Sequence, residues 1–104
     1  MAGLPFDEDA PLFSVGQVAQ MLGVQIAFVR RLDSEGVVEP SRSAGGQRRY
    51  TNAEVATVRQ VWRMAGDGMT MPGISRILEL EAEVANLENE LEHLRTRNAS
   101  RRTP

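Results

Sequence analysis

The sequence predicts a mainly α-helical fold, in which a winged helix-turn-helix domain is followed by a long coiled-coil helix. Two short amphipathic segments separated by a glycine indicate the helix-turn-helix, and a heptad repeat of apolar residues indicates the coiled coil. Between them lies room for one β hairpin, which would be the wing. We divide the chain into a flexible acidic arm (1–12), the helix-turn-helix domain (13–76), the coiled-coil helix (77–97) and a polar tail (98–104).

Composition excludes several classes of protein. The 104 residues leave space for one small domain and one long helix. The chain has no cysteine and one histidine, which excludes a disulfide framework, a zinc finger and a thiol nucleophile. No apolar run approaches the roughly 18 residues of a membrane span. The acidic N-terminus, with Pro5 and Pro11, is unlike a signal peptide, so we expect a cytoplasmic protein. We expect no cofactor.

The first helix-turn-helix segment begins at a capping box formed by Ser14 and Gln17. Its apolar stripe has helical spacing, and Gly23 is placed to end the helix. The second segment repeats the pattern and ends at Gly36. The residues expected to face the core are Val15, Val18, Ala19, Leu22, Ile26, Val29 and Leu32.

A hairpin and a third helix follow. We expect one strand at Val37–Val38, a loop over 40–46 and a return strand over 47–50. A second capping box, Thr51 with Glu54, opens the third helix, which Gly66 to Gly68 would end. Its inward residues are predicted to be Val55, Val58, Val61, Trp62 and Ala65. Thr70 and Pro72 signal a further helix start.

The last helix carries apolar residues spaced alternately by three and four positions, which is typical of a coiled coil. Such a narrow stripe suits one partner helix. The predicted dimerisation residues are Ile77, Leu80, Val84, Leu87, Leu91 and Leu94.

No catalytic or metal site is predicted. His93 lies among glutamates with no nucleophile placed to use it, and a solvated helix-face histidine is the simpler interpretation. Gly45 and Gly46 are not followed by the Lys and Ser/Thr of a phosphate-binding loop.

Charge along the chain favours nucleic-acid binding. The net charge of −2 conceals a basic middle, because residues 10–76 carry eight arginines and five acids. The second segment would expose Gln25, Ala27, Arg30 and Arg31 where such a helix enters the major groove of DNA. Three further arginines, Arg42, Arg48 and Arg49, lie on the hairpin, where they would neutralise phosphates.

These residues carry a family resemblance. Residues 13–80 resemble the MerR family of bacterial transcription regulators, most specifically in Pro40-x-Arg42, in Gly46-x-Arg48-Arg49-Tyr50 and in the following Glu54. The resemblance implies that the hairpin, including Gln47 and Tyr50, contacts DNA while the second helix reads bases. It also implies a homodimer joined by an antiparallel coiled coil and associated with the bacterial nucleoid.

Within the family the chain looks closest to the heat-shock repressor branch, which implies a repressor and a protein co-regulator, either a chaperone or RNA polymerase. The chain departs from the common recognition helix at Ala27, Phe28, Arg31 and Leu32. We expect Phe28 to be buried under the wing, the alternative being contact with a thymine methyl group. The cysteines of metal-sensing members are absent, and we expect a short form without an effector domain.

Three functional hypotheses follow. The first is a homodimeric regulator, a repressor, that binds double-stranded DNA at an inverted repeat. The second is a coiled-coil interaction adaptor with a degenerate winged helix. The third is an architectural protein, nucleoid-structuring or excisionase-like, with little base readout. An enzyme is not predicted.

Overall fold

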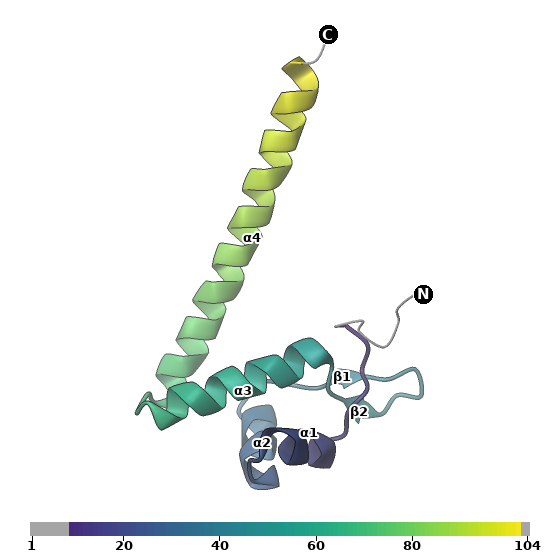
Figure 1. Cartoon of the computed structure of the whole chain (residues 1–104), viewed down its shortest axis with the longest axis vertical. Helices are drawn as coiled ribbons and strands as arrows, with labels where there is room; N and C mark the ends of the chain where they lie inside the picture. Colours follow the sequence, from purple (N-terminus) through teal and green to yellow (C-terminus); the bar gives the residue numbers. More distant parts are fainter. Residues whose placement is uncertain (1–8, 103–104) are drawn as a thin grey trace. The chain divides into compact units, whose positions relative to one another are not determined.

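A computed structural model describes residues 9–102, which form two compact units divided after Gly68. The first unit contains the helices α1 (Val15–Leu22), α2 (Ile26–Ser34) and α3 (Asn52–Gly66) with the strands β1 (Ser41–Arg42) and β2 (Arg48–Arg49) (Figure 1). The second unit contains α4 (Met71–Arg102). The predicted acidic arm falls mostly on residues 1–8, outside the described range.

The core of the first unit is mainly aliphatic, in keeping with the low aromatic content, and Tyr50 is its one aromatic residue among those described. Val18, Val29, Leu32, Val58 and Val61 have no exposed surface at all. Ala19, Val38, Tyr50 and Val55 complete the core, each no more than 6% exposed. Because every helix of this unit contributes to one core, the first unit folds around α1, α2 and α3 together.

Both predicted capping boxes are confirmed. At the start of α1, Ser14 Oγ accepts a hydrogen bond from the amide of Gln17, and Gln17 Oε1 accepts one from the amide of Ser14. Thr51 and Glu54 repeat this arrangement at the start of α3. Each box satisfies amide donors that have no partner inside the helix.

The position of the first hairpin strand differs from the prediction. The strand is Ser41–Arg42, inside the segment expected to be a loop, rather than Val37–Val38. The amides of Val37 and Val38 both donate to the carbonyl of Leu32, so they end α2 instead of pairing with a strand. The register pairs Ser41 with Arg49 and Arg42 with Arg48.

The segment before α1 also joins this hairpin, which the sequence did not indicate. Phe13 forms an antiparallel bridge with Tyr50, with N–O distances of 3.0 and 2.6 Å. The amide of Leu12 donates to the same Tyr50 carbonyl. The backbone of the predicted arm is therefore held to the hairpin at its C-terminal end.

Two residues that were predicted to face the core, Trp62 and Ile26, are only partly covered. Trp62 is 47% exposed and Ile26 39% exposed. On α3 the buried stripe consists of Val55, Val58 and Val61, and Trp62 lies one residue beyond it, rotated by about 100° around the helix axis. The indole therefore sits at the edge of the core.

The second unit is one continuous helix of 32 residues. Thr70 caps its start, since Thr70 Oγ1 accepts a hydrogen bond from the Gly73 amide at 3.2 Å. The helix begins before the predicted boundary at residue 77 and continues past Arg97 to Arg102, through most of the predicted tail. Its apolar heptad residues from Leu80 to Leu94 are all exposed. No helix among residues 9–102 is long and apolar enough to cross a membrane.

Candidate nucleic-acid interface

The turn between α1 and α2 fixes the orientation of α2. Gly23 adopts a left-handed conformation with φ of 69°, and its amide reaches the carbonyls of Ala19 and Gln20. A residue with a Cβ atom would be strained at this backbone angle. The four residues expected to face DNA are exposed: Gln25 at the N-cap of α2, and Ala27, Arg30 and Arg31 within the helix.

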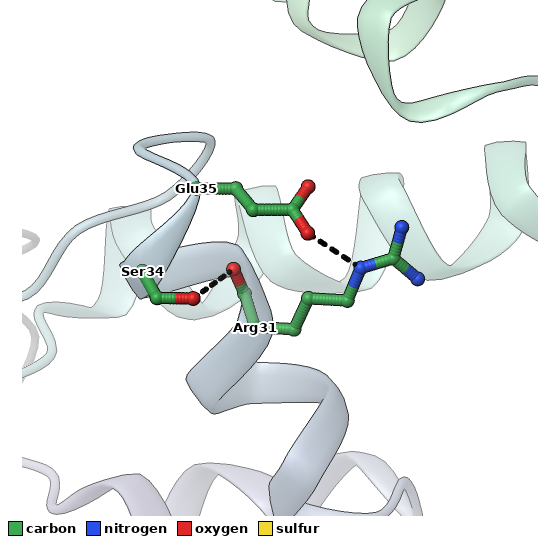
Figure 2. A network of polar contacts seen from close by, with 3 residues as sticks. All are labelled: Arg31, Ser34 and Glu35. Atoms are coloured by element: carbon green, nitrogen blue, oxygen red, sulfur yellow. Dashed lines mark hydrogen bonds and ion pairs between the residues drawn. The ribbon is translucent and has the colours of Figure 1, made fainter.

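Arg31 is held by its own helix. Its Nε donates to Glu35 Oε2 at 2.8 Å, and Ser34 Oγ donates to the Arg31 carbonyl at 3.1 Å. Figure 2 shows the two terminal nitrogens of the guanidinium on the side away from Glu35. Because a guanidinium has five N–H donors and Glu35 accepts from one of them, Arg31 can still donate two hydrogen bonds to a base edge or a phosphate.

Arg30 lies beside a hollow of about 360 Å³ that the hairpin shares with α1 and α2. Arg48 and Arg49 of β2 line the same hollow, together with Gln47 and with Asp33 of α2. Three arginines and one aspartate thus line it, so the residues around this concave surface carry a net positive charge, which favours an anion. The structure therefore brings Arg30 of α2 together with four predicted hairpin residues, Gln47, Arg48, Arg49 and Tyr50. The other predicted residues do not line this hollow: Gln25, Ala27 and Arg31 line a second one, and Arg42 lines neither.

The hairpin arginines are not equivalent. Arg48 Nη2 donates to Asp33 Oδ1 at 2.5 Å, and the neighbouring carboxylate raises the pKa of Arg48 above its ordinary value. Arg49 Nη2 donates to the neutral Gln47 Oε1 at 2.9 Å. Arg48 is consequently compensated in charge, whereas Arg49 keeps its full positive charge. Sequence reasoning missed Asp33, because nothing local links residues 33 and 48.

Arg42 serves the hairpin itself. Its Nη1 donates to the carbonyl of Gly46 at 2.9 Å, across the loop between the strands. Ser41 Oγ donates to Glu54 Oε2 at 2.7 Å, which ties β1 to the first turn of α3. Both bonds hold the hairpin in shape beside α2.

Tyr50 is a core residue. Only 2% of its surface is exposed, so the prediction that it contacts DNA is not supported by its position. Burial is the main cause that raises the pKa of its hydroxyl to about 12. The resemblance that suggested Tyr50 could not separate a contact residue from one that supports the hairpin.

Phe28 is half-buried, and its aromatic partner lies on α3 rather than on the hairpin under which we expected it. Its ring packs edge-on against Trp62 of α3, with ring centroids 5.0 Å apart at 80°. Both rings line a second hollow of about 630 Å³, with Gln25, Ala27 and Arg31. Trp62 is thus a neighbour of the exposed α2 residues. Its large apolar ring at a helical inward spacing had suggested core instead.

A helix-turn-helix whose second helix exposes arginines, with a basic hairpin beside it, is the architecture of a DNA-binding transcription regulator. Residues 13–81 match the sequence model of the MerR helix-turn-helix family of regulatory proteins. The chain belongs to this family.

Curated relatives agree with this assignment. The chain is 39% identical to the heat shock protein HspR of Streptomyces coelicolor over 78% of its own length and 54% of that protein. It is 30% identical to the transcriptional repressor CarH of Myxococcus xanthus over 70% of its length and 26% of CarH. It is 24% identical to the transcriptional regulator GlnR of Bacillus anthracis over 82% of its length and 68% of GlnR. The chain therefore spans about half of HspR and about a quarter of CarH.

Proposed function

We propose that this DNA-binding regulator acts as a homodimeric repressor at an inverted-repeat operator. α2 lies in the major groove, and the hairpin is a wing on the adjacent backbone. The similarity to the transcriptional repressor CarH supports the repressor assignment. The observation that carries the proposal is the shared hollow, where Arg30 of α2 and Arg49 of the hairpin face one concave surface.

The exposed heptad residues of α4 supply the dimer contact. Leu87 and Leu91 are 58% and 46% exposed in the single chain, and apolar residues in a regular heptad are buried when a second helix packs on them. We propose that the two α4 helices run antiparallel. Joining two small DNA-binding units makes the second half-site contact intramolecular, which raises affinity steeply.

Footprinting on the DNA upstream of the chain's own gene tests the proposal. The expected result is a protected palindromic site at moderate salt, with affinity at least 10³-fold above that for random DNA of equal length. Reporter expression from that promoter should fall when the protein is present.

The competing hypotheses give different results. A specificity ratio near one would contradict the regulator and support the architectural protein. Loss of cellular activity on Leu87→Asp, with activity retained after Arg49→Ala, would support the adaptor. Arg63→Ala, at an exposed position of α3 that does not line the hollow, is a matched control for the loss of one arginine.

A further inference from the structure

The apolar stripe of α4 is the row of heptad residues Ile77, Leu80, Val84, Leu87, Leu91 and Leu94. Every described residue from Glu79 to Arg101 is exposed in the single chain. A groove of about 300 Å³ lies along the N-terminal half of the stripe, and its lining includes the apolar Leu80 and Val84 and the acidic Glu81 and Glu88. A groove lined by both apolar and acidic residues favours a covering helix that carries apolar and positively charged side chains.

Charge is divided along α4 into two segments. The acidic segment, residues 79–92, contains six glutamates and no arginine. The basic segment, residues 95–102, contains four arginines and no acid. Because α4 continues to Arg102, the basic segment belongs to the same helix as the acidic segment.

The heptad repeat places these charges on the two flanks of the stripe. One flank carries Glu81, Glu88 and Arg95, and the other carries Glu83, Glu90 and Arg97. In an antiparallel pair of helices, each flank faces the same flank of the partner. The alignment of the two helices therefore decides whether glutamates meet arginines or other glutamates.

We infer that a second copy of this chain covers the stripe antiparallel, in the register centred on Asn89. This inference rests on the homodimer proposed above and specifies its geometry. Leu87 packs against the partner's Leu91, and Val84 against the partner's Leu94. On the flanks, Glu81 faces the partner's Arg95. Glu83 faces the partner's Arg97.

Each of these two Glu–Arg pairs occurs twice by two-fold symmetry, so the register contains four opposite-charge pairs. It also contains two like-charge pairs at its centre, where Glu88 faces the partner's Glu88 and Glu90 faces the partner's Glu90. Leu80 lies opposite the partner's Asn98. Ile77 lies opposite the partner's Arg101, whose aliphatic stem can cover an apolar neighbour. Ile77 is already half-buried in the single chain, so the register leaves little of it exposed.

The alternative arrangements bring like charges together. An antiparallel register shifted by one heptad, centred between Ala85 and Asn86, covers all six apolar residues. It sets Glu83 against the partner's Glu90, and Arg97 against the partner's Arg76. A parallel pair sets Glu83 against the partner's Glu88, and it lays the acidic segment beside its own copy. Like charges at facing flank positions destabilise a helix pair, and opposite charges stabilise it.

Charge reversal on one flank tests the register through the sign of its effect. In the inferred register, Glu83→Arg and Arg97→Glu each convert two opposite-charge pairs into like-charge pairs. Each is expected to raise the dimer Kd about tenfold at low salt. The double variant restores opposite charges and should return the Kd to within about threefold of the wild type. Glu92→Arg, on the outer face, is the matched control and should leave the Kd unchanged.

Sedimentation equilibrium at low and high salt provides the measurement. In the shifted register and in the parallel pair, either single reversal would tighten the dimer. A tighter dimer, or a double variant that fails to recover, overturns the inferred register while leaving the homodimer intact. A wild-type monomer at tens of micromolar overturns the homodimer itself and the register with it. At about 1 M salt the differences among variants should disappear, since the pairs are exposed.

Discussion

On the proposed DNA-binding surface, Asp33 makes the two adjacent arginines Arg48 and Arg49 unequal in charge compensation. Its bond to Arg48 cancels a charge that Arg49 retains, although both arginines line the same hollow. A neutralised phosphate contributes about 0.9 to the slope of log affinity against log salt. Arg49→Ala should therefore flatten this slope by about one unit per half-site, and Arg48→Ala by much less. Asp33→Asn, which frees Arg48, should steepen it and tighten binding to random DNA.

Titrations of affinity against salt on operator and random duplexes measure these slopes. Asp33→Glu keeps the carboxylate and serves as the control. Equal flattening by Arg48→Ala and Arg49→Ala would show that Asp33 does not compensate Arg48 in the complex. The exposed ion pair itself contributes at most about 1 kcal/mol to stability, so all these variants should remain folded.

Substitutions of Arg30 and Arg31 should affect sequence-specific binding in a way that substitutions of the hairpin arginines do not. Both are exposed on α2. An arginine that donates two hydrogen bonds to one base edge contributes roughly 1–3 kcal/mol at the correct site. At least one of Arg30→Ala and Arg31→Ala should weaken operator binding by that amount and random DNA binding much less. Competition assays with both duplexes provide the measurement. If both variants weaken both duplexes equally, specificity comes from Gln25, from the hairpin or from DNA deformability.

Tyr50 should show its burial directly, because it is the single tyrosine of the chain. Burial raises the pKa of its hydroxyl from 10.0 to about 12, so the folded state holds this proton more tightly than the unfolded state does. Tyrosinate absorbance near 295 nm should rise at about pH 12 in the native protein and near pH 10 in denaturant. Unfolding free energy should accordingly fall as the pH rises from 10 to 12. A native titration near pH 10 would place Tyr50 in solvent.

At the scale of the elements, Thr51 carries a measurable share of stability. It is 5% exposed, its hydroxyl caps α3, and its partner Glu54 also binds Ser41 of the hairpin. Thr51→Ala should lower the unfolding free energy by about 1–2 kcal/mol, whereas Thr51→Ser should recover most of it. Urea unfolding followed by circular dichroism measures both. An unchanged midpoint in Thr51→Ala would mean that another group caps the helix.

Local sequence signals identified most elements. The capping boxes and Gly23 act over three or four residues, and those boundaries were predicted correctly. The position of the first hairpin strand was predicted wrongly, because the amides of Val37 and Val38 donate back to Leu32, and a β-prone pair of residues gives no sign of that role. The Phe28–Trp62 contact and the Arg48–Asp33 pair join segments far apart in sequence, so neither could be read from local spacing.

At the scale of the whole molecule, the heptad stripe should determine the oligomeric state. Leu87→Asp would place two uncompensated carboxylates in the centre of an apolar interface, which costs several kcal/mol. The dimer Kd should rise roughly hundredfold or more. Asn89→Asp adds the same charge on the outer face and should leave the dimer intact. Light scattering of both variants checks this. A Leu87→Asp variant that remains dimeric would exclude the stripe as the interface.

The bond pattern around Leu32 bears on how this protein can evolve. Because the last turn of α2 and the approach to the hairpin share the Leu32 carbonyl, α2 cannot rotate or slide without disturbing the hairpin. If α2 reads DNA as proposed, we expect a new operator to be accommodated by exchange of its exposed side chains, because a movement of the helix would break these hydrogen bonds. Gln25, Ala27 and Arg30 stand outside the core, so they can change with little loss of stability. The backbone of α2 therefore stays in place, while the exposed side chains that would determine the recognised DNA sequence can change.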